Sequence, residues 1–371
     1  MRNLLVTGAE GFVGRNLVAT LRAVRPEWNL LLYDVGNSEE ELRAFVASAD
    51  FVFHLAGVNR PQSVEEFQTG NAGLTEFLVG LLKETGRAVP LMVSSSTQAS
   101  LDNPYGKSKR EAEAAAHAYG VQSGADVYVY RFPNVFGKWC RPNYNSAVAT
   151  FCHNTAHGLP INVSDPAVVM NLVYIDDLVE ELLRALDGRA NRVGEFCQVP
   201  LTHTVTLGRI ADLVVSFRKS RDDRSVPELS DPFVRKLYST YSSYLPTGAF
   251  SYPLLMNANE RGSFTEFLRT PDRGQVSINI SKPGILKGNH WHHTKCEKFL
   301  VVKGSGVIRF RQVGGTEVVE YRVDGEKLEV VDIPVGYTHN IENVGETDLV
   351  TVMWVNECFD PTNPDTFYLE V

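Results

Sequence analysis

Three glycines near the start of the chain, Gly8, Gly11 and Gly14, constrain the fold more than any other feature. They follow an apolar run that begins at Leu4, and they surround the start of a helical pattern at Phe12. Glycine lets such a turn close tightly, and it lets backbone N–H groups at a helix N-terminus approach a pyrophosphate. The spacing predicts a strand, a turn and a helix that bind a dinucleotide, with Phe12 and the glycines in the binding loop. A glycine-rich turn without a ligand is the alternative.

Two patterns of apolar residues divide the chain. Up to about Leu213, short apolar runs alternate with helical segments, which predicts right-handed crossovers and a doubly wound parallel sheet of the Rossmann type. From about Ser251, short β-branched runs are separated by Gly, Pro and Asn, which predicts an all-β barrel or jelly roll. We expect two domains, residues 1–245 and 246–371. The stretch 220–248 is rich in Ser, Asp, Pro and Tyr, and is expected to be a tether instead of core.

The composition argues against several classes of partner. A formal net charge of −8 is unfavourable for nucleic acid, because counterion release requires a basic protein surface. No apolar run reaches the roughly 18 to 20 residues of a membrane span, and the N-terminus lacks the long apolar core of a signal peptide. The five cysteines are scattered and never in CxxC spacing, which is typical of a reducing compartment. We therefore expect a cytoplasmic protein without nucleic-acid or membrane partners.

Asp34 ends the second apolar run, about 20 residues after the glycine-rich turn. A carboxylate at this place accepts a hydrogen bond from a ribose 2′-hydroxyl, which favours NADH over NADPH. Asp34 also precedes Gly36 and Asn37, so an ordinary role in a turn is the alternative.

Tyr105 and Lys109 are four residues apart, so they project from one face of a helix. A nearby ammonium group and a cofactor ribose can lower the pKa of the phenol, which then passes a proton to the alkoxide that develops during hydride transfer. Ser96 ends an upstream strand and is placed to hydrogen-bond the substrate oxygen. The pattern predicts an oxidoreductase in which Ser96, Tyr105 and Lys109 are the catalytic residues.

Residues 1 to about 215 resemble the extended short-chain dehydrogenase/reductase family. The matching segments are TGAEGFVG (Thr7 to Gly14), FVFHLAG (Phe51 to Gly57), SSS (Ser94 to Ser96), PYGKSK (Pro104 to Lys109), RFPNVFG (Arg131 to Gly137) and VYIDDL (Val173 to Leu178). The resemblance implies that Leu55, Ala56 and Asn71 lie at the cofactor or in its supporting loops, together with the glycines, Tyr105 and Lys109.

Substrates of this family are mostly nucleotide-diphosphate sugars, so the resemblance implies contacts for a sugar and a diphosphate. The candidates are Asn134, Lys138 and Arg141, although an ordinary exposed basic pair is an equal alternative. Only eight residues separate Ser96 from Tyr105, which is shorter than the family's usual spacing. We therefore expect a different loop over the sugar.

Four residues of the last third have the spacing of metal ligands. His290 and His292 alternate on a predicted strand and point to one face, and Glu297 follows on the next strand. His339 lies in a second run, Pro334-x-Gly336-x₂-His339-x₃-Asn343. Three imidazoles and one carboxylate suit Zn²⁺ or another divalent first-row metal. The alternative, a set of surface histidines, requires both runs to match by chance.

Residues 251–371 resemble the cupin superfamily, with Leu328 at a position where a glycine is expected. Two segments, Arg261 to Glu266 and Gln275 to His290, are similar to the 3,5-epimerases of dTDP-4-keto-6-deoxy sugars. The candidates for acid/base work beside the metal are Glu266, Lys287 and Tyr337. An ion pair, a solvated amine and a packed ring are equally acceptable roles for these three residues.

The order of the two domains resembles bifunctional enzymes of capsular polysaccharide biosynthesis over essentially the whole chain, including YSTYSSYLP and NPDTFYLEV. The resemblance implies C-3 epimerisation of UDP-2-acetamido-2,6-dideoxy-4-hexulose in the cupin. C-4 reduction to UDP-2-acetamido-2,6-dideoxy-L-talose would follow, on the path to UDP-N-acetyl-L-fucosamine for capsule or O-antigen. Such enzymes are expected to use NADPH, with NADH as the alternative. A homodimer is expected too, since it would cover exposed β edges.

Two other functions fit parts of the sequence. One is a decarboxylating or dehydrating sugar-nucleotide enzyme whose cupin is only a structural module. The other is a regulator that binds NAD(P)H or a sugar without turnover. The second is less favoured, because a sensor does not require the proton donor Tyr105 or its partners Ser96 and Lys109.

Overall fold

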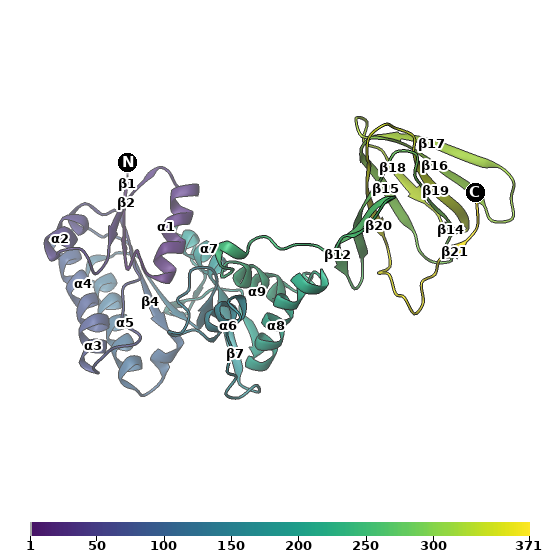
Figure 1. The fold of residues 1–371 in the computed structure, drawn as a ribbon. Coiled ribbons are helices and arrows are strands. Elements are labelled where there is room, and N and C mark those ends of the chain that lie inside the picture. Colours follow the sequence, from purple (N-terminus) through teal and green to yellow (C-terminus); the bar gives the residue numbers. More distant parts are fainter. Residues whose placement is uncertain (1) are drawn as a thin grey trace. The chain divides into compact units, whose positions relative to one another are not determined.

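The structure of the protein, a computed structural model, describes residues 2–371. Its contacts divide the chain into two compact units (Figure 1). The first unit ends at Val214 and also includes Pro232–Pro246, whereas the second combines Val215–Asp231 with Thr247–Val371.

The segment Val215–Asp231 differs from the predicted domain division, which placed it with the N-terminal domain. It pairs with a strand of the second unit, since Val226 donates its backbone N–H to the carbonyl of Arg269 at 2.9 Å. Arg269 in turn donates its own N–H to the carbonyl of Arg224 at 2.8 Å. These backbone bonds explain why contacts group the segment with the C-terminal unit.

A parallel sheet forms the centre of the first unit. Its order is β2-β1-β3-β4-β5-β9-β8, with only β8 and β9 antiparallel. The strands are β1 (Arg2–Thr7), β2 (Trp28–Tyr33), β3 (Phe51–His54), β4 (Leu91–Ser96), β5 (Val127–Phe132), β8 (Arg192–Val193) and β9 (Phe196–Cys197). The chain order reverses between β1 and β3, so the carboxyl ends of these strands form a crevice that suits a ligand. The predicted doubly wound sheet is confirmed.

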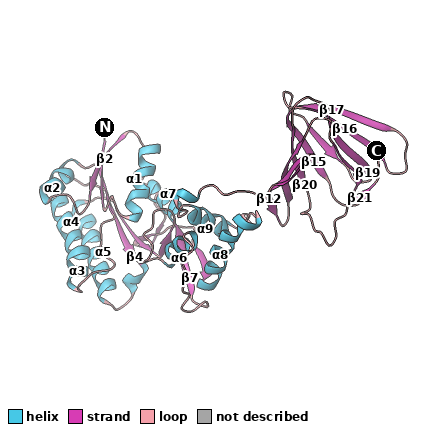
Figure 2. Cartoon of the chain, viewed as in Figure 1, coloured by secondary structure: helices cyan, strands magenta, loops and turns pink. Residues whose placement is uncertain are grey.

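Helices cover both faces of this sheet (Figure 2). The main ones are α1 (Phe12–Val24), α2 (Glu39–Ser48), α4 (Leu74–Glu84), α5 (Pro104–Ser123) and α7 (Ile175–Leu186). Leu4 and Val6 pack with α1 and α7, whereas Leu5 packs with α2 and α4 on the opposite face. Because side chains alternate along a strand, three consecutive apolar residues of β1 are needed to fill both layers.

A smaller sheet of order β10-β7-β6 lies in the same part of the chain. The further elements here are β6 (Asn134–Phe136), β7 (Val169–Tyr174), β10 (His203–Thr206), α6 (Ala147–Ala156), α8 (Leu207–Asp223) and α9 (Pro232–Ser242). The prediction of a tether without a core is wrong for α9, which buries Phe233, Leu237 and Tyr241. These residues are four apart and form one apolar helix stripe.

Short helical turns complete the helices. They are α3 (Glu65–Phe67), the π-helical η1 (Gln68–Gly73), and the 3₁₀ turns η2 (Thr97–Ser100) and η3 (Thr247–Ala249). Over residues 2–371, none of the helices combines the length and the apolar character that crossing a bilayer would need.

Two antiparallel sheets make up the second unit from residue 257 onward. Their orders are β11-β12-β13-β20-β15-β18 and β17-β16-β19-β14-β21. The strands are β11 (Asn257–Asn259), β12 (Gly262–Thr270), β13 (Gly274–Ser281), β14 (Leu286–Trp291), β15 (Glu297–Lys303), β16 (Ser305–Gln312), β17 (Val318–Asp324), β18 (Val330–Ile333), β19 (Tyr337–Asn343), β20 (Leu349–Val355) and β21 (Phe367–Tyr368). Phe299, Ile308 and Ile341 join the two sheets in one apolar core, so the predicted all-β cupin fold is confirmed.

Candidate active sites

The glycine-rich turn has the geometry that an anion requires. Gly8 has φ +70°, and a Cβ on Gly14 would lie 2.1 Å from the carbonyl oxygen of Gly8, so only glycine fits there. Helix α1 starts after the N-cap Gly11, and no side chain caps it. The first N–H groups of a helix have no intrahelical partner, so this end of α1 can hold a pyrophosphate.

A cavity of about 510 Å³ lies beside this turn. It is lined by Ala9, Glu10, Arg15, Val18, Ala19, Arg22, Leu32, Asp34, Asn37 and Trp139. Asp34 accepts the backbone N–H of Glu10 at 2.7 Å with one oxygen and that of Val35 at 2.8 Å with the other. Asp34 therefore ties the glycine-rich turn to the end of β2, which is the turn role that the sequence left open.

The residues predicted for catalysis meet at the carboxyl end of β4 and the start of α5. Asn103 caps α5 by accepting the N–H of Gly106 at 2.7 Å, and this fixes the turn that carries Tyr105. The Tyr105 phenol lies within hydrogen-bonding reach of Ser96. The Lys109 amine donates to the carbonyl oxygen of Ser94 at 2.9 Å. The structure thus brings Ser96, Tyr105 and Lys109 together, as their predicted roles require.

Burial dominates the ionisation of this group. It raises the pKa of Tyr105, and the hydrogen bond with Ser96 opposes the rise. Burial lowers the pKa of Lys109 to about 8, although the nearby Glu113 carboxylate opposes the fall. The expected lowering of the Tyr105 pKa is thus reversed in the protein alone, because desolvation outweighs the hydrogen bond. The phenol stays protonated at neutral pH, which is the state that a proton donor needs.

His54, which sequence reasoning did not select, connects the strands below this site. It is buried, and its ring nitrogens lie 2.7 Å from the Thr7 hydroxyl and 3.0 Å from the Thr75 hydroxyl. Burial lowers the pKa of His54 to about 3, so the ring is neutral. Ala56 donates its N–H to the Thr7 hydroxyl at 3.3 Å, which fixes the predicted cofactor segment Leu55–Ala56 beside the glycine-rich turn.

Asn71 supports the same region from η1. Its side-chain carbonyl accepts the N–H of Val58 at 2.9 Å, and its amide donates to the carbonyl of Val58 at 2.9 Å and to the Ser108 hydroxyl at 3.1 Å. Ser108 precedes Lys109 on α5. Asn71 is therefore placed as a support of the catalytic helix, in agreement with the supporting-loop role that the resemblance implied.

The three residues predicted for sugar and diphosphate contacts have different surroundings. Asn134 is exposed at the start of β6. The ammonium group of Lys138 forms an ion pair with Asp176, and the guanidinium of Arg141 lies 5.0 Å from the Tyr144 ring centre. Lys138 already has a counter-ion, so Asn134 and Arg141 are the freer candidates for a substrate.

The four predicted metal ligands come together inside the second unit. His290 lies on β14, His292 follows it, Glu297 begins β15 and His339 lies on β19. One ligand atom from each residue lies within 4.8 Å of the others. The closest of these contacts join Glu297 Oε2 to His339 Nε2 at 3.1 Å and to His292 Nε2 at 3.5 Å.

The surroundings of this quartet fit a cation. Nε2 of His292, Oε2 of Glu297 and both ring nitrogens of His339 are buried without a well-formed hydrogen bond among residues 2–371. Burial lowers the pKa of His290 to about 4, so its ring is neutral and one nitrogen keeps a lone pair for a cation. Burial alone would raise the pKa of Glu297, but the neighbouring His292 and His339 rings lower it to about 2. Imidazole nitrogens and an ionised carboxylate are ligands that Zn²⁺ takes in proteins.

A β-bulge aligns the quartet with Lys287. In the pairing of β14 with β19, Lys287 faces Ile341 and His290 faces His339. Two residues lie between Lys287 and His290 on β14, but only one lies between Ile341 and His339 on β19. Gly288, with φ +104°, and Asn289, with φ +60°, absorb the extra residue. Because side chains alternate along β19, Lys287 and His290 face the same side, which a regular strand would not allow.

Asn289 is held in this bulge by Asn340, whose amide donates to its side-chain carbonyl at 2.9 Å. The Gly288-Asn289 pair inside a strand pattern is the sequence signal that could have revealed the bulge.

The three acid/base candidates are not equivalent. The Lys287 amine donates to Asn279 Oδ1 at 2.7 Å and to the carbonyl of Ile280 at 2.8 Å, and burial lowers its pKa. Glu266 is held instead by Arg269, through bonds of 2.8 and 3.0 Å, and by Arg224 at 3.3 Å. Two guanidinium groups thus pair with the Glu266 carboxylate, which is the ion-pair role that the sequence left open. The third candidate, Tyr337, packs on the apolar core.

Comparison with known proteins covers both units. Residues 4–198 match the NAD dependent epimerase/dehydratase family, and residues 257–367 match the polysaccharide biosynthesis C-terminal domain. The chain belongs to the NAD-dependent epimerase/dehydratase family. A family member from Pseudomonas aeruginosa, UDP-2-acetamido-2,6-beta-L-arabino-hexul-4-ose reductase, is 45% identical to it over 99% of this chain and 98% of the relative.

Solved structures extend this similarity over the full chain. The capsular polysaccharide assembling protein CapF from Staphylococcus aureus has a TM-score of 0.95 at 54% identity, covering 100% of both chains. A CapF structure with the inhibitor 3-isopropenyl-tropolone has a TM-score of 0.90 at 50% identity, again covering 100% of both chains. The predicted resemblance to enzymes of capsular polysaccharide biosynthesis is confirmed, and this family member is an NAD(P)-dependent enzyme with a Rossmann-type domain.

We predict that the reduction rate falls above pH 8. Lys109 loses its charge with a pKa of about 8 in the protein alone, and a neutral amine no longer favours the proton transfer from Tyr105. The rate should decline about tenfold per pH unit on the alkaline side, with kcat/KM for the keto-sugar measured by NADPH oxidation, because kcat/KM reports the ionisation of the enzyme without sugar. Lys109→Arg should move this decline upward, because a guanidinium stays charged. A flat profile between pH 7 and 9.5 contradicts the prediction.

We predict that Gly288→Ala weakens Zn²⁺ binding by about 10- to 100-fold, as disturbed ligand supports do. A Cβ at this position would lie 2.8 Å from the carbonyl oxygen of His339, so the bulge must shift and turn His290 away. Isothermal titration of metal-free protein with Zn²⁺ measures the effect. Gly248→Ala is the matched control, since its Cβ meets open space. Equal affinities in the two variants would refute the role of the bulge.

Proposed function

We propose that the protein is a bifunctional enzyme acting on a UDP-sugar. Its C-terminal unit epimerises C-3 of UDP-2-acetamido-2,6-dideoxy-4-hexulose, and its N-terminal unit then reduces C-4 to give UDP-2-acetamido-2,6-dideoxy-L-talose. The product belongs on the path to UDP-N-acetyl-L-fucosamine for capsule or O-antigen. The name of the Pseudomonas aeruginosa relative, a reductase of a UDP-linked hexul-4-ose, supports this substrate class.

One observation carries the proposal. One group in the chain, Ser96, Tyr105 and Lys109, has the residues of a reductase. A second, separate cluster consists of four metal-type ligands, and Lys287 lies on the same side of β14 as its member His290. A reductase alone requires no second site with buried imidazoles and an amine whose pKa is lowered by burial. Buried polar groups without partners are costly in a purely structural module.

The epimerisation depends on the acidity of C-3. A proton there is acidic because the neighbouring C-4 carbonyl stabilises the enolate. A divalent ion held by His290, His292, Glu297 and His339 would supply Lewis-acid stabilisation of the developing oxyanion. Lys287 is our candidate for moving the proton, because burial lowers its pKa and Asn279 fixes the amine at 2.7 Å.

The reduction uses the side chains at the end of β4. The nicotinamide cofactor supplies the hydride, and Tyr105 donates the proton that completes the C-4 hydroxyl. Ser96 hydrogen-bonds the same oxygen, and the Lys109 ammonium favours release of the phenolic proton. Reduction removes the carbonyl and with it the acidity of C-3, so epimerisation comes first.

Zn²⁺ is the proposed metal, with another divalent first-row ion as the alternative. Three imidazoles and one carboxylate are common ligands of Zn²⁺. The inhibitor in the CapF structure, a tropolone, presents adjacent carbonyl and hydroxyl oxygens, a bidentate donor set that favours metal ions. This chemistry supports a metal-dependent step in that relative and, by extension, in this chain.

NADPH is the proposed cofactor. The cavity beside the glycine-rich turn contains the guanidinium groups of Arg15 and Arg22, which suit the extra phosphate of NADPH. Asp34, which favoured NADH at first, already accepts two backbone N–H groups. Its lone pairs are therefore less available to a ribose hydroxyl.

A homodimer in the cytoplasm is the proposed state, without nucleic-acid or membrane partners. On β13, Val276, Ile278 and Ile280 are half-exposed, whereas the residues between them are buried and polar. This inverted alternation leaves an apolar outer face on the larger sheet, next to Val352 and Trp354 of β20. A second copy of the chain would cover such a face.

We predict that Arg15→Ala and Arg22→Ala raise the KM for NADPH by about 10-fold or more, because a charge-assisted hydrogen bond to the phosphate is lost. The KM for NADH should change little. Steady-state kinetics with each cofactor gives the ratio. Arg25→Ala is the matched control, since Arg25 follows the same helix but pairs with Asp187 at 3.1 Å. An equal rise in KM for both cofactors would show that the arginines do not bind the extra phosphate of NADPH.

We predict that the full chain incorporates deuterium from D₂O at C-3 of the 4-keto UDP-sugar without any nicotinamide, as followed by NMR. A chelator should abolish the uptake and Zn²⁺ restore it. Lys287→Ala should slow exchange by about 100-fold or more, the usual contribution of a general acid or base. Tyr105→Phe should exchange normally but fail to reduce. Absence of uptake by the metal-loaded chain would leave a single-activity reductase with a structural cupin.

A further inference from the structure

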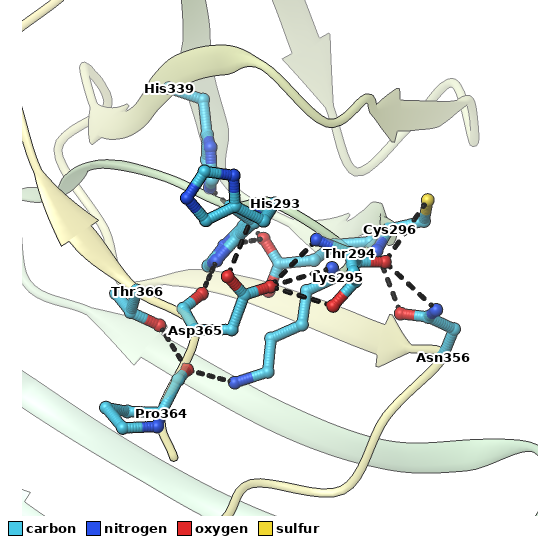
Figure 3. A network of polar contacts seen from close by, with 11 residues as sticks. His293, Thr294, Lys295, Cys296, His339, Asn356, Pro364, Asp365 and Thr366 are labelled. Carbon is cyan, nitrogen blue, oxygen red and sulfur yellow. Dashed lines mark hydrogen bonds and ion pairs between the residues drawn. The ribbon is translucent and has the colours of Figure 1, made fainter.

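The loop between two metal-type ligands is held by a residue from the C-terminal tail. Asp365 lies about seventy positions after this loop, and its carboxylate accepts the backbone N–H groups of His293 at 3.0 Å, Thr294 at 2.9 Å and Lys295 at 3.1 Å (Figure 3). The Thr294 hydroxyl donates to the same carboxylate at 3.1 Å. This loop connects His292 to Glu297, so one carboxylate holds three of the four residues between them, and Asn356 accepts the N–H of the fourth, Cys296, at 2.8 Å.

The backbone of Asp365 also contacts a ligand directly. Nδ1 of His292 lies 2.6 Å from the carbonyl oxygen of Asp365. A carbonyl can only accept, so Nδ1 carries the hydrogen of the neutral ring and Nε2 keeps its lone pair. That Nε2 is the atom that faces Glu297, at 3.5 Å. The Asp365 carbonyl therefore selects the tautomer in which His292 can ligate a cation.

We propose that Asp365 is a positioning residue of the metal centre, which orients His292 and shapes the loop to Glu297 without ligating the ion itself. This inference rests on the metal-dependent function proposed above. The four ligand atoms that cluster come from other residues, and every oxygen of Asp365 that is described has an N–H or O–H partner in the loop.

The backbone conformation of Asp365 indicates that several contacts fix its position. Its φ of +38° lies in the left-handed region, which an aspartate adopts at a cost. Such a conformation persists when several interactions determine it together. Burial alone would raise the pKa of the carboxyl, but the loop N–H groups hold it well below its usual range, so the acceptor is an anion.

Neighbouring contacts hold the tail against the ligand strand. The Lys295 ammonium donates to the carbonyl of Pro364, and the Thr366 hydroxyl donates to the same oxygen at 2.9 Å (Figure 3). Strand β21 then pairs with β14, and the rings of Phe367 and Trp291 lie 5.0 Å apart. Asp365 is thus presented by a segment that is anchored on both sides.

Asp365→Asn tests the proposal with little change of shape. The substitution replaces one acceptor oxygen by an NH₂ group, which must face N–H donors of the loop. We expect Zn²⁺ affinity to fall by about 10- to 100-fold, the usual effect of losing a group that orients a ligand, in competition with a chromophoric chelator. With Co²⁺ in place of Zn²⁺, the visible ligand-field bands should shift, because the position of His292 changes.

Asp360→Asn is the matched control. Asp360 lies in the same tail and loses the same charge, but its carboxylate accepts from the N–H and the hydroxyl of Thr362 and not from the loop between His292 and Glu297 within residues 2–371. Reduction of a pre-epimerised sugar should be unchanged in both variants, which shows that the reductase unit is intact. Circular dichroism spectra equal to that of the unchanged chain show that the second unit is folded.

The outcomes distinguish the positioning role of Asp365 from the metal-dependent function itself. Tighter zinc binding by Asp360→Asn than by Asp365→Asn, with shifted cobalt bands only in the latter, supports the proposal. Equal zinc affinity and equal cobalt spectra in Asp365→Asn and the unchanged chain overturn it, while the metal site stands. An unchanged chain that takes up neither ion overturns the metal-dependent function and the role of Asp365 together.

Discussion

Close approach of backbone to backbone at glycine is the constraint on which both candidate sites depend. At Gly14 a Cβ would lie 2.1 Å from a carbonyl of the dinucleotide turn, and at Gly288 it would lie 2.8 Å from the carbonyl of His339. In the first unit this approach opens the N-terminus of α1 to an anion. In the second it creates the bulge that turns Lys287 and His290 to one side. Each chemistry is thus placed by a residue that contributes no side chain.

The two sites differ in the groups that pair with their buried carboxylates. Glu113, beside Lys109, receives two bonds from the Arg131 guanidinium, at 2.9 and 2.6 Å, so its charge is compensated within the chain. Glu297 faces the His292 and His339 rings, at 3.5 and 3.1 Å, instead of a guanidinium. Under the proposed function a divalent cation would balance the carboxylate charge together with these rings, which is why the metal-dependent step is assigned to the second unit and not to the first.

Local patterns were enough to predict both folds and to select side chains that the structure brings together, because strand and helix periodicities and ligand spacings extend over short stretches of sequence. Features that depend on contacts between distant segments were missed or misread. Helix α9 was expected to be a tether, although Phe233, Leu237 and Tyr241 form a helical stripe. Glu266 pairs with Arg224 of another segment, a contact that no spacing in the sequence indicates. No sequence spacing connects Asp365 to His292, since the tail reaches the loop only in the folded chain.

Under the proposed function, the order of reactions places a demand on the reductase. Reduction destroys the carbonyl that makes C-3 acidic, so a sugar reduced too early can no longer be epimerised. The N-terminal unit must therefore discriminate between C-3 epimers. The eight-residue connection from Ser96 to Tyr105 is suited to this, because η2 shortens it and Arg110 fixes it through the carbonyls of Ala99 at 2.6 Å and Leu101 at 2.7 Å. A connection tied at two carbonyls has little freedom to move. Rigidity of this kind would turn a difference at one carbon into a difference in the position of C-4 relative to Tyr105.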